Sequence, residues 1–143
     1  MTDIIRNARR LVLDMDFGID YSMALLYLLR TKRVEIVAIG TVHGNAEASS
    51  AVRNADQLLR TEGLVGIPLA LGAGAPLRRE AHFASEVHGA DGIGGMSDGL
   101  AASGISTESA AQQLVRLARE QPGELTILAT GPLTNLAVAL ELE

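Results

Sequence analysis

Four short apolar runs, each followed by a segment with helical spacing of apolar residues, most strongly constrain the fold of this chain. The runs lie at 10–14, 34–41, 67–71 and 125–129, and the helical segments at 22–30, 46–62, 106–120 and 133–142. No tight hairpin signal joins two of the runs, so the strands are expected to form right-handed βαβ units. We therefore predict one α/β domain over residues 1–143, with an open, mainly parallel sheet flanked by helices, a Rossmann-like arrangement.

The segment 72–104 departs from this alternation. It is rich in glycine and lacks a clear period, and loops of that length are usually functional. We expect Ser106 or Thr107 to cap the helix that follows, and Gly63 to end the helix over 46–62.

Composition narrows the class of protein. The net charge of −5 argues against nucleic acid and anionic membranes as partners, and the absence of cysteine excludes a disulfide framework and thiolate metal sites. The arginine-bearing N-terminus has no apolar run long enough for a signal sequence, and no segment is long and apolar enough to span a bilayer. A cytoplasmic location is the expectation.

Three carboxylates follow the first apolar run within seven residues: Asp14, Asp16 and Asp20. Unpaired carboxylates at the end of a buried strand are costly unless a cation or hydrogen-bond donors offset them, so a hard metal ion is a natural candidate. The simpler interpretation is that Asp20 or Ser22 caps the first helix, although one cap does not require three acids.

Two further strand ends carry polar residues. His43 to Asn45 follow the second run, and Thr130 with Gly131 follows the last, ahead of Thr134 and Asn135. Ligands of open α/β sheets bind outside the carboxyl ends of the strands, so these groups are expected to meet at one site. Asn45 has an equally good alternative role as the cap of the helix over 46–62.

The acidic motif resembles the start of two enzyme families. Haloacid-dehalogenase-like phosphatases also begin with D-x-D, but Phe17-Gly18-Ile19 fits their pattern badly. The run 14–21, DMDFGIDY, is similar to the D-x-D-P-G-x-D-D signature of the inosine-uridine preferring nucleoside hydrolases. Four later segments resemble motifs of that family in the same order: Gly44-Asn45 with Arg53-Asn54-Ala55, His88 to Gly95, Pro122-Gly123-Glu124, and Thr130 to Ala137.

This resemblance implies calcium-assisted hydrolysis of the N-glycosidic bond of ribonucleosides to ribose and free base. By position, it gives Asp16 the roles of calcium ligand and general base, and gives Thr130 a ligand role through its carbonyl oxygen. Asp20 and Asn45 then face the substrate, and Asp14 supports the cluster from behind.

The histidines are less well defined by the resemblance. His88 lies in a family-like segment and is a candidate substrate contact, with a solvated loop histidine as the alternative. His43 and His82 match no functional position of the family and are interpreted as incidental.

Two residues depart from the signature. Tyr21 stands where the family has a calcium-ligating acid, and a neutral phenol is a poor replacement. Phe17 replaces a proline, which removes a rigid turn residue. We therefore expect weak calcium binding or none.

The resemblance covers the N-terminal half of a family member. The family's further ligands and most of its base contacts fall beyond residue 143, so the preferred base stays open. The sequence leaves two functions: a nucleoside hydrolase of impaired activity, or a non-catalytic α/β binding or assembly module. Either would expose a sheet edge and apolar helix faces, so we expect a homo-oligomer that covers them.

Overall fold

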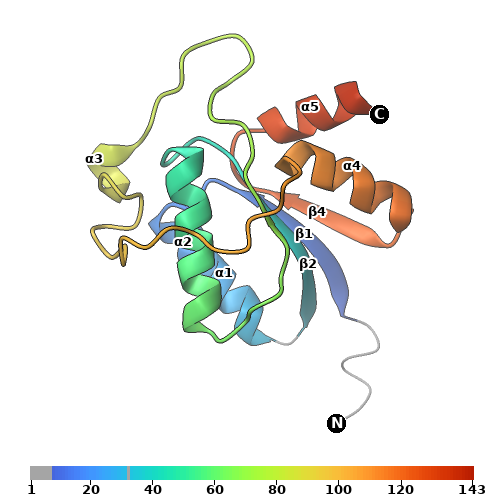
Figure 1. Cartoon of the computed structure of the whole chain (residues 1–143), viewed down its shortest axis with the longest axis horizontal. Coiled ribbons are helices and arrows are strands. Elements are labelled where there is room, and N and C mark those ends of the chain that lie inside the picture. Colours follow the sequence, from blue (N-terminus) through green and yellow to red (C-terminus); the bar gives the residue numbers. More distant parts are fainter. Residues whose placement is uncertain (1–7, 32) are drawn as a thin grey trace.

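The computed structural model describes residues 8–31 and 33–143, which form one four-stranded parallel sheet with helices on both faces (Figure 1). The elements in chain order are β1 (Arg9–Met15), α1 (Ile19–Thr31), β2 (Val34–Thr41), α2 (Ala48–Thr61), β3 (Leu69–Ala70), α3 (Ser85–His88), α4 (Ala110–Glu120), β4 (Leu125–Ala129) and α5 (Thr134–Leu142). The strand order is β3-β2-β1-β4, and every pairing is parallel. The predicted fold class is confirmed.

Successive side chains of β1 point to opposite faces of the sheet, because side chains alternate along a strand. Leu11, Leu13 and Met15 pack into the larger core with residues of α1 and α2, whereas Val12 packs with Leu114 and other residues of α4. Helices α1 and α2 therefore cover one face, and α4 and α5 cover the other (Figure 1).

Several boundaries differ from the sequence expectation. Helix α1 begins at Ile19 rather than 22, and β3 has two residues rather than five. Helix α4 begins at Ala110, and its cap is Ser109, whose hydroxyl accepts from the backbone N–H of Gln112 at 3.2 Å. The expected caps Ser106 and Thr107 are wrong because the helix begins after them, while the N–H of Ser106 bonds the carbonyl oxygen of Leu69 and continues the β3 edge. Gly63 ends α2 as predicted, with φ of 68°.

The glycine-rich segment is fastened to α2. The side-chain amide of Asn54 donates to the carbonyl oxygen of Asp91 at 2.9 Å, and Arg60 pairs with Asp98 at 3.0 Å. The Asp91 carboxylate accepts from three backbone N–H groups that follow it, which fixes the turn and lowers the pKa of this carboxyl. Helix α3, which lies within the segment, was not expected from the sequence.

No helix in the described part of the chain is both long and apolar enough to cross a membrane.

Candidate functional site

The carboxyl ends of β1, β2 and β4 lie side by side, and we call this part of the sheet the carboxyl edge. Asp14 of β1 is level with Gly40 of β2 and with Ala129 of β4. The chain places β2 on one side of β1 and β4 on the other, so the connections diverge at β1, where α/β sheets bind ligands. The polar residues that follow the three strands are therefore brought together, as the sequence pattern indicated.

Asp16 is held at the centre of this edge by the segment after β2. Its Oδ2 accepts from the backbone N–H of Asn45 at 2.8 Å, and its Oδ1 accepts from the Asn45 side-chain amide at 3.4 Å. The carboxylate is 4% exposed, and burial raises its pKa more than the Asn45 hydrogen bond lowers it. The alternative role of Asn45 as a helix cap is wrong, because α2 has Glu47 at its N-cap and no side-chain cap.

Glycine is required at two places around Asp16. A Cβ on Gly44 would lie 2.1 Å from Asp16 Oδ2, and a Cβ on Gly18 would lie 2.5 Å from Asn45 Nδ2. Both segments therefore approach the Asp16–Asn45 pair more closely than a side chain permits.

Asp14 lies beneath Asp16 and is 1% exposed. Its Oδ1 accepts from Asn135 Nδ2 at 2.7 Å, and its Oδ2 has no hydrogen-bond partner. Burial raises the pKa of this carboxyl to about 6.

Asn135, in the first turn of α5, ties the strand ends together. Besides Asp14, its amide donates to the carbonyl oxygen of Thr41 at 2.8 Å, and its Oδ1 accepts from the N–H of Ala73 at 2.8 Å. One buried side chain thus joins the ends of β1 and β2 to the segment after β3.

Asp20 and His88 lie above this buried layer. Asp20 is exposed in the first turn of α1, where its charge raises the pKa of Asp16. His88 reaches over from the end of α3, and its Nδ1 accepts from the backbone N–H of Ile19 at 3.2 Å. His88 therefore contacts the N-terminal turn of α1 while its side chain stays half-exposed.

The described residues do not form a calcium cage. Calcium takes six to eight oxygen ligands, whereas no group of three or more His, Asp or Glu side chains in residues 8–31 and 33–143 could hold a metal ion. Tyr21 packs against the larger core, and burial together with the charges of Asp16 and Asp20 raises the pKa of its phenol, which stays neutral. Thr130 donates its N–H to the carbonyl oxygen of Asp14 at 3.1 Å, and its buried hydroxyl has no partner.

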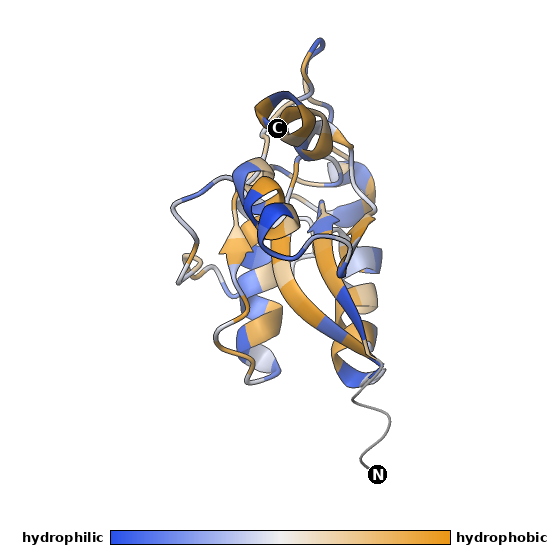
Figure 2. Cartoon of the chain, turned by 90° about the vertical axis from the view of Figure 1, so that its right-hand side faces the viewer, coloured by the Kyte–Doolittle hydropathy of each residue, from blue (hydrophilic) through white to orange (hydrophobic). Residues whose placement is uncertain are grey.

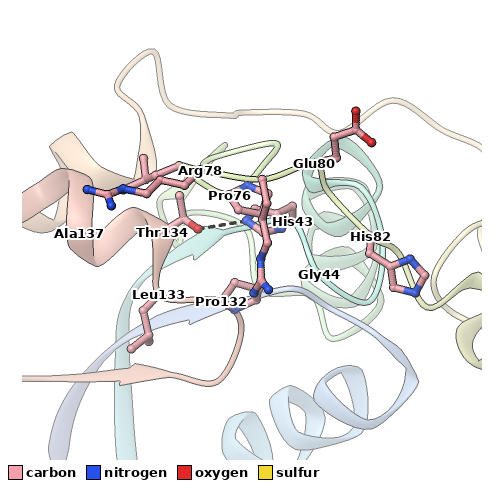
Figure 3. Close-up of a pocket in the computed structure, with 12 residues that line it drawn as sticks. His43, Gly44, Pro76, Arg78, Glu80, His82, Pro132, Leu133, Thr134 and Ala137 are labelled. Carbon is pink, nitrogen blue, oxygen red and sulfur yellow. Dashed lines mark hydrogen bonds between the residues drawn. The ribbon is translucent and has the colours of Figure 1, made fainter.

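A cavity of about 840 Å³ opens beside the carboxyl edge (Figure 3). Gly44 lines it, and a Cβ on Gly44 would lie 2.1 Å from Asp16 Oδ2, so the buried carboxylate lies just behind this wall of the cavity. His43 is 3% exposed on this wall, its Nε2 shares a hydrogen bond of 3.0 Å with Thr134 Oγ1, and burial lowers its pKa.

The structure brings both of the histidines interpreted as incidental, His43 and His82, to the lining of this cavity. For His43 the signal was present in the sequence, since it directly precedes Gly44-Asn45 at a strand end. His82 lies in the segment 72–104, whose path no local pattern determines.

Known proteins resemble the chain over nearly all of its length. A family model described as inosine-uridine preferring nucleoside hydrolase matches residues 11–143. Uridine nucleosidase 1 of Arabidopsis thaliana is 41% identical over 97% of this chain and 42% of its own length. The inosine-uridine preferring nucleoside hydrolase of Leishmania major is 34% identical over 94% of this chain and 44% of its own.

Solved structures agree with these relatives. The plant nucleoside hydrolase PpNRh1 superposes with a TM-score of 0.88 and 37% identity, over 94% of this chain and 43% of its own. A purine-preferring ribonucleoside hydrolase from Gardnerella vaginalis gives a TM-score of 0.86 at 26% identity, over 93% of this chain and 43% of its own. The chain thus spans less than half the length of these relatives.

Proposed function

This chain belongs to the inosine-uridine preferring nucleoside hydrolase family, and we propose that its carboxyl edge acts in the hydrolysis of the N-glycosidic bond of ribonucleosides. The observation that carries the proposal is the buried Asp16 carboxylate, held by Asn45 where three strand ends meet and lying directly behind Gly44, which lines a cavity.

Asp16 is the general base of this proposal. Its burial raises the pKa of the carboxyl, so it binds a proton more tightly than a surface carboxylate does. In the reaction the oxygen of a water attacks C1′ of the ribose while Asp16 takes a proton from that water. The C1′–N bond breaks, and the base leaves with the bonding electron pair and acquires a proton. Carboxylates beside C1′ stabilise the positive charge that develops there.

The neighbouring groups position the sugar. Asp20 is exposed next to Asp16 and can accept hydrogen bonds from ribose hydroxyls, and the Asn45 amide can bind the same sugar. His88, at the end of α3, is the further substrate contact, and its ring lies near Asn45 beside Gly18. The cavity lined by His43 receives the rest of the nucleoside.

The described residues 8–31 and 33–143 hold no cluster of three or more acidic or histidine side chains fit for a metal ion. We expect this chain to bind calcium weakly or not at all, with Asp16 and the Thr130 carbonyl as its partial ligands. The phenol of Tyr21 supports this expectation, since it packs on the core and carries no charge.

The same observation favours a second candidate, a non-catalytic α/β module that binds ribonucleosides without cleaving them. Tyr21 removes a charge from the signature while the Asp16–Asn45 pair and the cavity remain. The two candidates differ in turnover and share the binding site.

Ribose release from uridine and from inosine tests the proposal. We expect slow release that Asp16→Asn lowers by about 100-fold or more, the usual contribution of a general base. The matched control is Asp98→Asn, which removes a carboxylate that pairs with Arg60 of α2. This variant should leave release unchanged. Release that survives Asp16→Asn would refute the role of Asp16.

Calorimetric titration of the chain with uridine distinguishes the non-catalytic module from the hydrolase. Binding without release supports the non-catalytic module, and absence of both rejects a nucleoside site in this chain. Tyr21→Asp should strengthen calcium binding in the same instrument. A variant that binds calcium no better than the unchanged chain would contradict the ligand role of this position.

A further inference from the structure

The segment 72–104 has two parts that the structure holds differently. The part before α3 projects from the molecule and ends in a hydrophilic tip (Figure 2). The part from α3 onward lies along α2, where side chains on successive turns of the helix fasten it: Asn54, Gln57 and Arg60 (Figure 1). Asn54 differs from the other two, because its amide also donates to the carbonyl oxygen of Phe17, in the segment that follows β1.

The side-chain amide of Asn54 lies at the junction of these segments. It donates to the Asp91 carbonyl oxygen at 2.9 Å and to the Phe17 carbonyl oxygen at 3.3 Å, and the side chain is 1% exposed. Gly92 closes the same junction, since a Cβ there would lie 3.2 Å from Asn54 Nδ2 and 3.6 Å from the Phe17 carbonyl oxygen. A buried amide shared by two carbonyl groups fixes their separation, because a buried carbonyl without a donor is costly.

The position of Asp91 determines that of His88, because the backbone closes the turn between them. The N–H of Gly92 donates to the Gly89 carbonyl oxygen at 3.1 Å, and the N–H of Gly94 donates to the His88 carbonyl oxygen at 2.7 Å. The Asp91 carboxylate binds three backbone N–H groups that follow it, which fixes the turn further. The hydrogen bond from Asn54 to Asp91 therefore sets the place of His88 as well.

The second acceptor of Asn54 lies next to the site of His88. Phe17 has φ of 31°, in the left-handed region that side chains disfavour, and it is fully buried. Its neighbour Gly18 is in close contact with two side chains, since a Cβ on Gly18 would lie 2.5 Å from Asn45 Nδ2 and 2.9 Å from His88 Cε1. The bond from Asn54 to Phe17 thus holds the backbone on which His88 packs beside the Asp16–Asn45 pair.

These contacts also determine which nitrogen of His88 carries the proton. Its Nδ1 accepts from the backbone N–H of Ile19 at 3.2 Å, so the neutral ring has its proton on Nε2. We propose that Asn54 is a positioning residue, which holds His88 beside the carboxyl edge in this tautomer with the Nε2–H as the donor to the substrate. The inference rests on the proposed function, in which His88 contacts the nucleoside.

Two substitutions on α2 separate the positioning of His88 from the fastening of the segment. Asn54→Ala and Gln57→Ala each remove two side-chain hydrogen bonds of α2. Those of Gln57 join the carbonyl oxygen of Met96 and the N–H of Asp98, both at 2.9 Å and beyond the turn that carries His88. Gln57→Ala is therefore the matched control.

A second pair of variants keeps Asn54 in place and decides the result if Asn54→Ala does not fold. Gly92→Ala would place a Cβ 2.6 Å from the Ala46 Cβ and 3.2 Å from Asn54 Nδ2, which pushes the turn away from the amide. Gly95→Ala is its control, because Gly95 has nearly the same φ, 82° against 81°, and open space around it.

Amide hydrogen exchange of Ile19 measures the contact of His88 directly. Ile19 is the first residue of α1, so its N–H has no acceptor within the helix. We expect Asn54→Ala and Gly92→Ala to speed this exchange by on the order of tenfold and to weaken uridine binding in calorimetry by a similar factor, with both control variants within about twofold of the unchanged chain. Nitrogen NMR shifts of the His88 ring should show the Nε2–H tautomer in the unchanged chain.

A double-mutant cycle with His88→Ala tests whether Asn54 acts through His88. In that background Asn54→Ala should cause no further loss of uridine affinity, and a further loss would overturn the proposal. Equal acceleration of Ile19 exchange by Asn54→Ala and Gln57→Ala, or an Nδ1–H tautomer in the unchanged chain, would overturn it too. An unchanged chain that does not bind uridine would refute the proposed function, and Ile19 exchange with the tautomer would then decide the positioning of His88.

Discussion

Replacing Asn135 with aspartate tests whether this side chain holds the carboxyl edge together. The substitution keeps the oxygen that accepts from Ala73 and removes the amide that donates to Asp14 and to the Thr41 carbonyl. At pH 7.5 it also places a second carboxylate 2.7 Å from a buried one. The fold should survive with its strand ends poorly joined.

The expected cost follows from the two lost bonds. A buried hydrogen bond to a charged group contributes about 1.5–3 kcal/mol, and an unsatisfied buried carbonyl costs a similar amount, so Asn135→Asp should lower the free energy of unfolding by roughly 3–5 kcal/mol at pH 7.5. That is a fall in melting temperature of roughly 10 °C or more. Near pH 5 the two carboxyls can share a proton and restore one bond, so the loss should shrink by about half.

Urea unfolding at pH 7.5 and pH 5, with EDTA present, measures both values. The matched control is the double substitution Asp14→Asn with Asn135→Asp, which exchanges donor and acceptor and should recover the bond between the two positions but not the one to Thr41. A single variant within about 0.5 kcal/mol of the unchanged chain at pH 7.5, or a double variant no more stable than the single one, would refute the role of Asn135.

Three further perturbations test other parts of the structure. The folded-state pKa of Asp14, about 6, is above its unfolded value of 3.8, so its contribution is complete below pH 3.8 and is lost as pH rises through 6. Asp14→Asn should therefore remove about 3 kcal/mol of the pH dependence between pH 4 and pH 7 in urea titrations, and an unchanged slope would contradict this. Gly44→Ala should displace the Asp16 carboxylate and lower stability by about 1–3 kcal/mol, whereas Gly74→Ala, with open space around it, should have little effect on thermal unfolding. Ser109→Ala should cost about 1 kcal/mol through loss of the α4 cap, while Ser106→Ala should cost less.

The fold could be predicted largely from local pattern. Strands β2 and β4 occupy the predicted residues 34–41 and 125–129, because short runs of apolar and β-branched residues between turn residues mark parallel strands well. The start of α4 could not be predicted in this way. Ser106, Thr107 and Ser109 are all good caps by residue type, and the choice depends on the pairing of Ser106 with β3, a contact distant in sequence.

The site, like the fold, has features that the local pattern predicts and features that depend on contacts distant in sequence. The meeting of Asp16 with Asn45 follows from the rule that parallel strand ends share one edge, and the sequence pattern predicted it. The position of His82 on the cavity depends on how the segment 72–104 crosses the molecule, whereas His43 directly follows β2. Its fastening to α2 through Asn54 and Arg60 has no periodic signal.

Helix α5 belongs to two surfaces at once. Its first turn contributes Asn135 to the carboxyl edge, and Leu140 in its last turns lines a groove between α4, α5 and β4. At nine residues it is too short to be stable alone, so packing at one end determines its order at the other. The packing of the last turns of α5 therefore supports the hydrogen bonds that Asn135 makes to Asp14 and to the carbonyl oxygen of Thr41.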